Sequence, residues 1–360
     1  MKKIVALILL ILSTGCSKKS KLNEYSNINV SAGFDTYLSL KISAEKLEDF
    51  ENYFNESVNL YDSLNRQFDI YNSYPGINNL KTINEFAGIE PVKVDQEIID
   101  LLLLSKEMSE LSNGAFDVSA GALFKKWHDY READDGSIPS DEELQNTLKC
   151  IGWEFVEIND TNNTVYINNP CASLDVGAIA KGYATEKIAH LLEEKEVVMA
   201  IIDAGGNNRT INNKEDGSPW NVGIQNPDDS GSIAIVSKRD SSSFVTSGDY
   251  QRYYMGDDQI RYHHIIDPKT AYPANYFRSV TVITTDSGIA DAFSTILFSL
   301  PYKEGLAIIE KYNTLNPENL ISAVWILDKE NSQQSDFTLE NENFQVIYTE
   351  DLKDSIKLSK

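Results

Sequence analysis

The chain has 360 residues, enough for two domains or for one large α/β domain, with hydrophobic and charged shares of 41% and 24% that are typical of globular proteins. Its formal net charge of −23 argues against nucleic acid as a partner, because binding to a phosphate backbone needs a basic surface. The same acidity means that any phosphate-bearing ligand needs local shielding by a metal ion or a helix dipole.

The first residues have the pattern of a secretion signal. A basic start precedes an apolar run over residues 4–12, which is too short to span a bilayer. The run ends in STGC, which resembles a bacterial lipoprotein signal acylated at Cys16, although Ser13 stands where such signals more often have leucine. We therefore expect a signal peptide over residues 1–15 and a polar, flexible membrane tether over residues 16–30.

The next segments alternate between strand and helix patterns. Residues 34–43 alternate apolar and polar positions, as a half-buried strand does. Residues 44–68 repeat apolar side chains every three or four positions, which predicts a long helix. After a turn-rich loop over residues 70–79, a second helix begins behind Asp95 as its N-cap and ends at Asn113-Gly114.

A third helix and a hairpin follow. The sequence SDEE from Ser140 is a capping box and predicts a helix to about residue 148. The sequence predicts strands over residues 155–158 and 165–167 that form a hairpin between Cys150 and Cys171. A disulfide is allowed in an exported protein, so the two cysteines either pair or stay free, and their spacing does not suggest zinc.

The remaining elements are mostly strands. We expect strands over residues 197–202, 221–225, 233–237, 280–284, 321–327 and 344–348, helices over 289–300 and 303–312, and a turn over 246–250. A further helix carries Lys181 on its first turn and runs to about residue 194. The sequence DAGGN from Asp203 lacks the spacing of a dinucleotide-binding fingerprint. The mixture of antiparallel and helical elements predicts an α+β or mixed α/β fold, not a doubly wound nucleotide-binding fold.

The stretch LDVGAIAKGYA over residues 174–184 is the strongest candidate for a ligand site. An extended run ends at Asp175, and a helix follows that carries Lys181 on its first turn. Between them, Gly177 and Ala178 allow a ligand to approach the backbone, and the unpaired amides of a helix start favour an anion. The alternative is a strand–turn–helix whose glycines only permit tight packing.

A second candidate is a metal site. Asp291 and Thr295 lie four residues apart in a helical pattern and therefore share one face. A carboxylate and a hydroxyl suit a hard cation such as magnesium, whereas a transition metal would take histidine or cysteine ligands.

Among the histidines, His264 is the candidate general base, because imidazole changes charge near neutral pH. The alternative is that His264 is a packed turn residue that bonds Asp267 locally. His263 points to the opposite side of an extended segment, and His128 and His190 lack catalytic neighbours in the sequence.

Taken together, these separated motifs resemble the signature of the ApbE family, the FAD:protein FMN transferases. The resemblance covers about residues 31–350 and rests on FDT at 34–36, GAFD at 114–117, LDVGAIAKGYA at 174–184, GG at 205–206, SGDY at 247–250, HIIDPKT at 264–270 and DAFST at 291–295. The chain departs from the family at Ala271, where glycine is usual, and at Phe34, where methionine is usual.

The resemblance implies an α+β, T-fold-like fold with mixed sheets and packed helices in a single catalytic unit over residues 31–350, followed by a C-terminal tail over 351–360. It also implies an exported lipoprotein that binds FAD with magnesium and transfers FMN to a threonine or serine hydroxyl of a partner protein, releasing AMP. Family partners are typically flavin-acceptor subunits of membrane electron-transport complexes. The alternatives are an FAD pyrophosphatase that gives FMN and AMP, and a lipoprotein that binds flavin without chemistry.

By position, the resemblance implies a magnesium site made of Asp291, Thr295 and the backbone oxygen of Ala178, with His264 as the base. The residues implied to contact FAD are Phe34, Tyr71, Ala115, Phe116, Asp117, Asp175, Lys181 and Ile266.

Overall fold

The computed structural model describes residues 22–359, so the expected signal peptide and Cys16 lie outside the described residues. Within residues 22–359, no helix has both the length and the apolar character needed to cross a bilayer. The described helices are α1 (Leu47–Phe68), α2 (Leu80–Glu85), α3 (Gln96–Leu111), α4 (Gly121–Ala133), α5 (Asp141–Leu148), α6 (Ala180–Glu194), α7 (Ser287–Phe298) and α8 (Tyr302–Leu315). The described strands are β1 (Asn23–Gly33), β2 (Thr36–Ala44), β3 (Val92–Lys93), β4 (Val156–Asn159), β5 (Thr164–Ile167), β6 (Ala200–Ala204), β7 (Asn207–Ile211), β8 (Trp220–Gln225), β9 (Ser232–Lys238), β10 (Ser242–Gly248), β11 (Tyr253–Met255), β12 (Arg261–His263), β13 (Ser279–Thr284), β14 (Ser322–Asp328), β15 (Thr338–Glu340), β16 (Phe344–Tyr348) and β17 (Ile356–Leu358).

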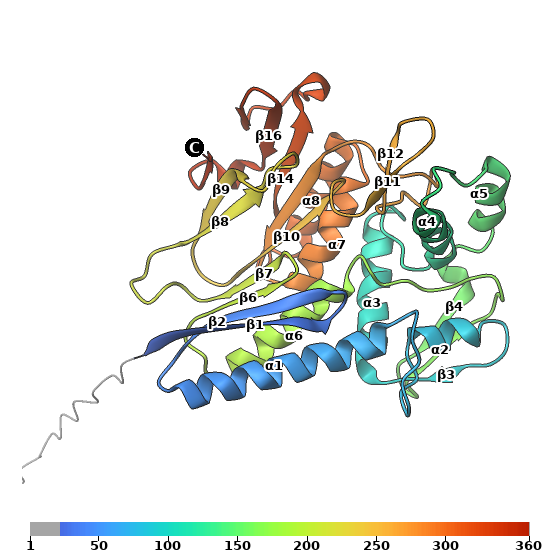
Figure 1. The fold of residues 1–360 in the computed structure, drawn as a ribbon, viewed down its shortest axis with the longest axis horizontal. Helices are drawn as coiled ribbons and strands as arrows, with labels where there is room; N and C mark the ends of the chain where they lie inside the picture. The colour runs from blue at the N-terminus through green and yellow to red at the C-terminus, as the bar shows by residue number, and fades with distance from the viewer. Residues whose placement is uncertain (1–21, 360) are drawn as a thin grey trace, which may run out of the picture.

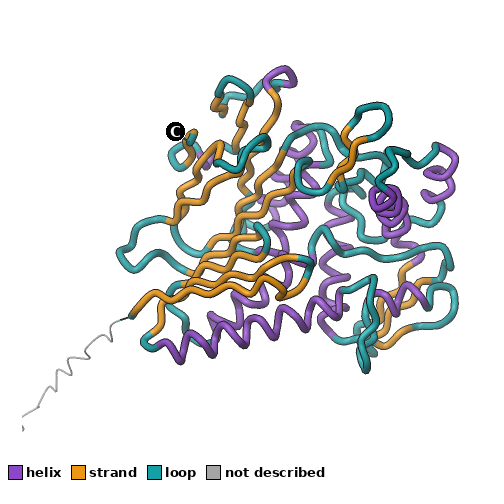
Figure 2. The backbone as a smooth tube through the Cα atoms, viewed as in Figure 1, coloured by secondary structure: helices purple, strands orange, loops and turns teal. Residues whose placement is uncertain are grey.

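A nine-stranded sheet organises the molecule. Its strand order is β1-β2-β6-β7-β10-β13-β14-β16-β15, and each neighbouring pair is antiparallel. Helices α6 and α7 pack against one face of the sheet, and the smaller sheet β17-β9-β8 lies by its β14 and β16 end (Figure 1). Figure 2 shows the strands gathered in one layer and helices beside it. The predicted α+β class is confirmed.

Strands β13 and β14 are buried on both faces, since each face meets a different layer. Along β13, Val280 and Val282 join the main core under the helices, whereas Ile283 joins a second core shared with β8 and β9. In β14, Trp325 belongs to the main core and Val324 to the second one. This division follows the two-residue period of a strand. It explains why β14 is an almost continuous apolar run in the sequence.

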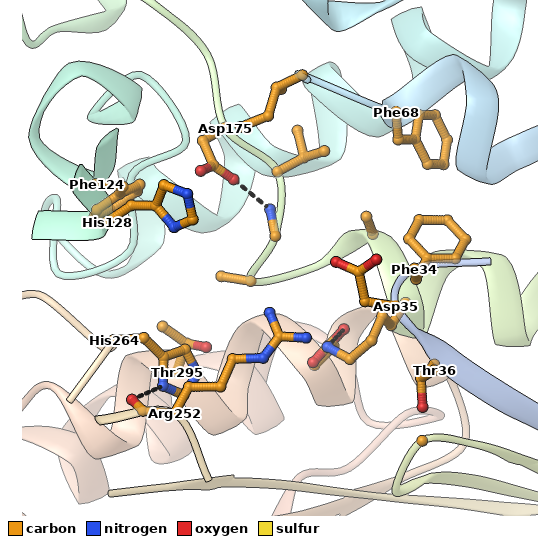
Figure 3. Close-up of a pocket in the computed structure, with 18 of the residues that line it drawn as sticks. Phe34, Asp35, Thr36, Phe68, Phe124, His128, Asp175, Arg252, His264 and Thr295 are labelled. Carbon is orange, nitrogen blue, oxygen red and sulfur yellow. Dashed lines mark hydrogen bonds and ion pairs between the residues drawn. The ribbon is translucent and has the colours of Figure 1, made fainter. Parts of the chain in front are cut away.

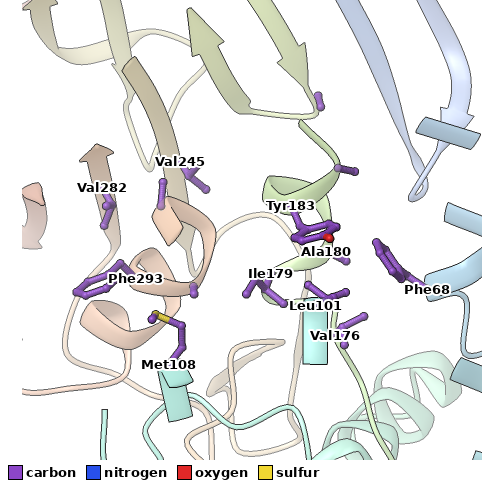
Figure 4. Close-up of a cluster of buried hydrophobic side chains, with 14 of the residues drawn as sticks. Phe68, Leu101, Met108, Val176, Ile179, Ala180, Tyr183, Val245, Val282 and Phe293 are labelled. Atoms are coloured by element: carbon purple, nitrogen blue, oxygen red, sulfur yellow. The ribbon is translucent and has the colours of Figure 1, made fainter. Parts of the chain in front are cut away.

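The main core joins α3, α6 and α7 beneath the sheet (Figure 4). In that figure Phe293 lies near Val282 and Val245, and Tyr183 of α6 lies near Phe68 at the end of α1. The Phe68 and Tyr183 rings meet edge to face with their centroids 5.8 Å apart. This core holds α6 and α7 together, and these two helices carry several of the candidate site residues.

Most predicted elements are confirmed, with boundaries within three residues of the observed ones. The capping box of α5 is present, since Ser140 and Glu143 bond each other's backbone. Asp95 occupies the N-cap position of α3, but its side chain makes no capping hydrogen bond. Cys150 and Cys171, for which the sequence left both states open, form a disulfide with Cα atoms 5.3 Å apart.

The expected flexible tether is wrong for residues 23–30, which belong to β1 and pair with β2. The apolar side chains of Ile28 and Val30 in this strand are 52% and 75% exposed. The sequence of β1 therefore lacks the alternation of buried apolar and exposed polar residues that predicts a strand. The strand is instead held by its backbone ladder and by Tyr25, which stacks on Phe50 at 5.7 Å. The expected tail is likewise part of the fold, because Ile356 in β17 pairs with β9.

Two further differences concern the neighbourhood of the site. The turn expected over residues 246–250 is wrong for residues 246–248, which continue β10. Their polar side chains have partners in the interior: the Thr246 and Thr281 hydroxyl oxygens lie 2.8 Å apart. Helix α4 was not predicted, because its N-cap, Ala120, makes no side-chain cap and its last residue is followed by Asp134 in the left-handed region, with φ 48°.

A buried ion pair ties α6 to the sheet and to α7. The Glu186 carboxylate accepts hydrogen bonds from the Arg209 guanidinium at 2.9 Å and from the Ser287 backbone N–H at 2.8 Å. Burial alone would raise the pKa of Glu186, but the hydrogen bonds from His190 and Arg209 outweigh it and lower this pKa to about 2. The ionised form of Glu186 therefore stabilises the fold.

We expect a corresponding pH dependence of stability. Because the pKa of Glu186 is lower in the folded protein than its ordinary value of about 4.5, its contribution is present above pH ~4.5 and is lost as the pH falls towards 2. The loss is of order 3 kcal/mol in the free energy of unfolding. In urea titrations at several pH values, the free energy of unfolding of Glu186→Gln should fall less steeply below pH ~4.5 than that of the wild type. Glu193→Gln changes the half-exposed second partner of Arg209, and its free energy of unfolding should fall as steeply as that of the wild type. The same pH dependence of the free energy of unfolding in all three proteins would contradict this assignment.

Candidate active site

A pocket of about 540 Å³ opens where the main sheet, α4 and α7 meet, and its size lies in the range of small-molecule sites. Figure 3 shows Asp175, His128 and Phe124 on one side of it and His264, Thr295 and Arg252 on another. The predicted site residues that line it are Phe34, Tyr71, Asp175, Ala178, Lys181, His264, Ile266, Asp291 and Thr295. The other three, Ala115, Phe116 and Asp117, line a small adjoining pocket that shares Asp175, Ala178, Ile266 and Thr295. The structure thus brings all the predicted site residues together.

The β1–β2 turn places Phe34 at the pocket wall. Phe34 and Asp35 have φ values of 52° and 53°, the two left-handed residues of a type I′ hairpin, so the strand expected from residue 34 begins at Thr36. Asn65 Oδ1 accepts the Phe34 backbone N–H at 2.7 Å, and the Phe34 ring meets Tyr61 edge to face at 4.9 Å. This α1 support holds a bulky residue in a conformation that such residues rarely adopt.

The segment before α6 combines packing with an accessible backbone. Gly182 is a packing glycine, since an added Cβ would clash with the Ser287 backbone oxygen of α7, and here the packing alternative is correct. Gly177, by contrast, is exposed at the pocket, and its N–H donates to Asp175 Oδ1 at 2.8 Å. Burial raises the pKa of the Asp175 carboxyl. The segment therefore offers the ligand both a carboxylate and open backbone.

Asp291 is a buried carboxylate at the floor of the pocket. Its Oδ2 accepts the Gly182 N–H at 2.7 Å and lies 3.9 Å from Lys181 Nζ. Desolvation raises the pKa of Asp291, while Lys181 and the Gly182 N–H act in the opposite direction. The Thr295 hydroxyl, one turn along α7, lies 3.5 Å from Ser247 Oγ. Within residues 22–359, no cluster of three or more His, Cys, Asp or Glu side chains is placed to hold a metal.

The His264 ring has a defined tautomer. Its Nδ1 lies 3.2 Å from the Arg252 carbonyl oxygen, which also accepts the His264 backbone N–H at 3.0 Å. A carbonyl only accepts, so Nδ1 carries the proton and Nε2 is left with a free lone pair. Although the ring is exposed to the pocket, desolvation, His263 and the nearby Arg252 lower the pKa of His264 to about 3. His264 is therefore neutral at physiological pH, and its ring bonds Arg252 rather than Asp267.

His263 has a structural role. It is buried, its Nε2–H donates to the Ala274 carbonyl at 2.7 Å, and its Nδ1 accepts the Ile265 N–H at 3.2 Å. Both ring nitrogens are used, and burial lowers the pKa of His263 to about 4. The expectation that only one of the two neighbouring histidines faces the site is confirmed.

Helix α4 supplies pocket residues that the sequence did not reveal. Phe124, His128 and Arg131 recur at helical spacing and line the pocket, and the His128 ring lies 5.5 Å from that of Tyr71. The sequence shows no catalytic neighbours for His128, but the fold places it at the pocket wall beside Tyr71. Arg252 was also missed, since no motif marked it. The helical spacing of the three α4 residues was the available signal.

The sequence profile of the ApbE family matches residues 34–316. The chain belongs to the ApbE family. It is similar to the FAD:protein FMN transferase of Treponema pallidum, with 30% identity over 327 residues that cover 86% of this chain and 88% of that protein. It is also similar to the FAD:protein FMN transferase of Vibrio cholerae, with 29% identity over 309 residues that cover 85% and 90% of the two chains.

Solved members of the ApbE family share the fold. The flavin transferase ApbE from Vibrio cholerae matches with a TM-score of 0.76 at 25% identity, covering 93% of this chain and 100% of that one. The ApbE protein from Thermotoga maritima matches with a TM-score of 0.73 at 29% identity, covering 84% and 94%. The ApbE-like fold predicted from the motifs is therefore confirmed. Ala271, at the usual family glycine, adopts φ 65°, the conformation that favours glycine.

Proposed function

We propose that this protein transfers FMN from FAD to a serine or threonine hydroxyl of a partner protein and releases AMP. The single observation that carries this proposal is the free Nε2 of a neutral His264 in the same pocket as Asp291 and Thr295. Family membership supports the flavin substrate, because the named relatives are FAD:protein FMN transferases.

The chemistry of the pocket suits a dinucleotide. Phe34 and Tyr71 offer aromatic surface for a ring, and the smaller adjoining pocket adds the buried Phe116. The adjoining pocket shares Asp175, whose carboxylate can accept hydrogen bonds from ring N–H or ribose hydroxyl groups. Lys181 lines the same pocket and would supply positive charge to the phosphates.

The oxygen donors fit magnesium. Asp291 gives one buried carboxylate, Thr295 a hydroxyl from the same face of α7, and Ala178 a backbone carbonyl, all at one pocket. Magnesium is commonly held by one or two carboxylates, with substrate phosphates and water as the other ligands, so a cluster of three acidic side chains is not required. When bound, magnesium would neutralise phosphate charge and polarise the phosphorus centre.

The reaction that these residues support is a phosphoryl-type transfer. His264 Nε2 takes the proton of the acceptor hydroxyl as the hydroxyl oxygen forms a bond to the flavin-side phosphorus. The P–O bond to the adenylate breaks, and its electron pair leaves with AMP. The Arg252 carbonyl holds the ring in the tautomer that this step needs.

Incubation of the full-length protein with FAD, magnesium and a candidate acceptor tests this function. The expected result is AMP release together with flavin fluorescence that stays on the acceptor through denaturing electrophoresis. Release of FMN and AMP without labelled acceptor would favour an FAD pyrophosphatase. FAD that is bound and recovered intact would favour a binding protein without chemistry.

We also propose that the protein is exported and anchored through a lipid on Cys16, so that it meets acceptor subunits of electron-transport complexes outside the cytoplasm. The support is the STGC sequence after the apolar run. In cells fed labelled palmitate, the wild type should take up label and sediment with membranes. Cys16→Ser should lose both properties, and equal labelling of the two proteins would contradict the anchor.

A further inference from the structure

Among the basic residues of the pocket wall, Arg252 is the one whose side chain has no partner within residues 22–359. Lys181 Nζ lies 3.9 Å from Asp291, and Arg131 Nη2 lies 2.8 Å from His128 Nδ1. The Arg252 guanidinium lines the same pocket, yet within residues 22–359 it has no hydrogen bond or ion pair. In a chain of net charge −23, this arginine lines the pocket without a carboxylate partner.

Both the backbone and the side chain of Arg252 lie at the site. Its backbone carbonyl accepts two hydrogen bonds from His264, at 3.0 and 3.2 Å. Figure 3 shows its side chain leaving this point and extending into the pocket, on the same side as Thr295. Arg252 precedes β11 and His264 follows β12, so the guanidinium and the candidate base lie side by side at the open end of the β11–β12 hairpin.

The charge of the pocket makes an anion the fitting partner for this guanidinium. The pocket wall carries four carboxylates, those of Asp35, Asp69, Asp175 and Asp291, and none of them pairs with Arg252. A planar guanidinium presents a fork of N–H donors that matches two phosphate oxygens, which a lysine ammonium does not.

We propose that Arg252 is a catalytic residue that binds the non-bridging oxygens of the flavin-side phosphate and stabilises their charge during transfer. This inference rests on the proposed function. As the acceptor oxygen bonds to phosphorus and loses its proton to His264, negative charge on these oxygens is balanced by the guanidinium. The AMP phosphate leaves with the electron pair of the broken P–O bond. The Arg252 carbonyl orients the His264 imidazole, and the Arg252 guanidinium lies beside it, so one residue positions both the base and the donor to the phosphate oxygens.

The first test compares ligands with and without phosphate. Arg252→Gln should weaken FAD binding about 10- to 100-fold, as expected for loss of a charged hydrogen bond, and should change riboflavin binding less than about twofold. Arg252→Lys keeps the charge but not the fork and should give an intermediate FAD affinity. The backbone carbonyl remains in both variants, so the orientation of His264 is preserved.

Arg261→Gln is the matched control. Arg261 lies on the same hairpin and pairs with Asp249 outside the pocket, and Asp249 keeps Arg278 as a partner when Arg261 is replaced. This variant should bind FAD and riboflavin as the wild type does. At saturating FAD, transfer by Arg252→Gln should also be slower by about 100-fold, the usual effect of removing one oxyanion donor.

Wild-type FAD affinity and transfer rate in Arg252→Gln would overturn the proposal. Equal losses of FAD and riboflavin affinity would also overturn it, because they would show that Arg252 shapes the pocket without contacting phosphate. If the wild type binds FAD but labels no acceptor, the proposed function fails. The comparison of FAD with riboflavin still decides whether Arg252 holds the phosphate.

Discussion

Replacing His264 with alanine is expected to slow FMN transfer by about 10²- to 10⁴-fold, the usual contribution of a positioned base. FAD affinity should change little, because the imidazole is proposed to act on the acceptor hydroxyl. Single-turnover rates with FAD in excess, measured beside the dissociation constant of FAD, separate the two effects. Added imidazole should restore part of the lost rate, which a purely structural role of His264 would not produce.

The pH profile gives an independent check on the same residue. A base works in its unprotonated form, so its contribution is lost as the pH falls through its folded pKa. Because desolvation, together with His263 and Arg252, lowers the pKa of His264 to about 3, transfer should show no inflection near pH 6.5 and should decline only towards pH 3. The free energy of unfolding must be measured at the same pH values, because protonation of Glu186 destabilises the fold below pH ~4.5.

His190→Ala is a suitable control, since His190 contacts Glu186 on α6 and does not line the pocket. Its transfer rate should stay within about twofold of the wild type. If His264→Ala transfers at the wild-type rate, another group takes the hydroxyl proton.

Periodicity made much of the fold predictable. Helix α1 buries one apolar stripe along its length, and strand β14 is an almost continuous apolar run that is buried on both faces, so each pattern predicts its element. The exposed β1 gave no such signal, because its ladder is made by backbone groups. Helix α4 begins without a side-chain cap, so its start also lacked a local signal.

The sequence predicted which residues form the candidate site, but not their protonation or backbone conformation. The motifs identified Asp291 and His264, and the fold brings both to one pocket. The tautomer of His264 depends on the Arg252 carbonyl, twelve residues earlier across the β11–β12 hairpin. Likewise, the turn at Phe34 places two non-glycine residues at positive φ, which a strand pattern does not reveal. Such contacts between distant backbone groups have no periodic signature in the sequence.

Removing the charge of Asp291 is expected to abolish metal-dependent release of AMP. Asp291→Asn is the sharper variant, because an amide oxygen can still accept the Gly182 N–H at the α6–α7 contact, whereas alanine would leave that buried donor unpaired. Isothermal titration with Mg²⁺ in the presence of FAD should show a loss of metal affinity. We expect the AMP release rate to fall at least about 100-fold, as for loss of a principal electrostatic group.

Two substitutions of Thr295 also test the proposed magnesium site. Thr295→Val removes the hydroxyl at nearly constant volume, and Thr295→Ser keeps it. Since Thr295 is half-buried one turn from Asp291 on α7, both variants should fold, and thermal unfolding checks this. Metal affinity should fall in the valine variant and persist in the serine variant. If Asp291→Asn and Thr295→Val both release AMP at the wild-type rate with unchanged magnesium affinity, the metal is held elsewhere, and the buried Asp291 carboxylate serves the α6–α7 contact alone.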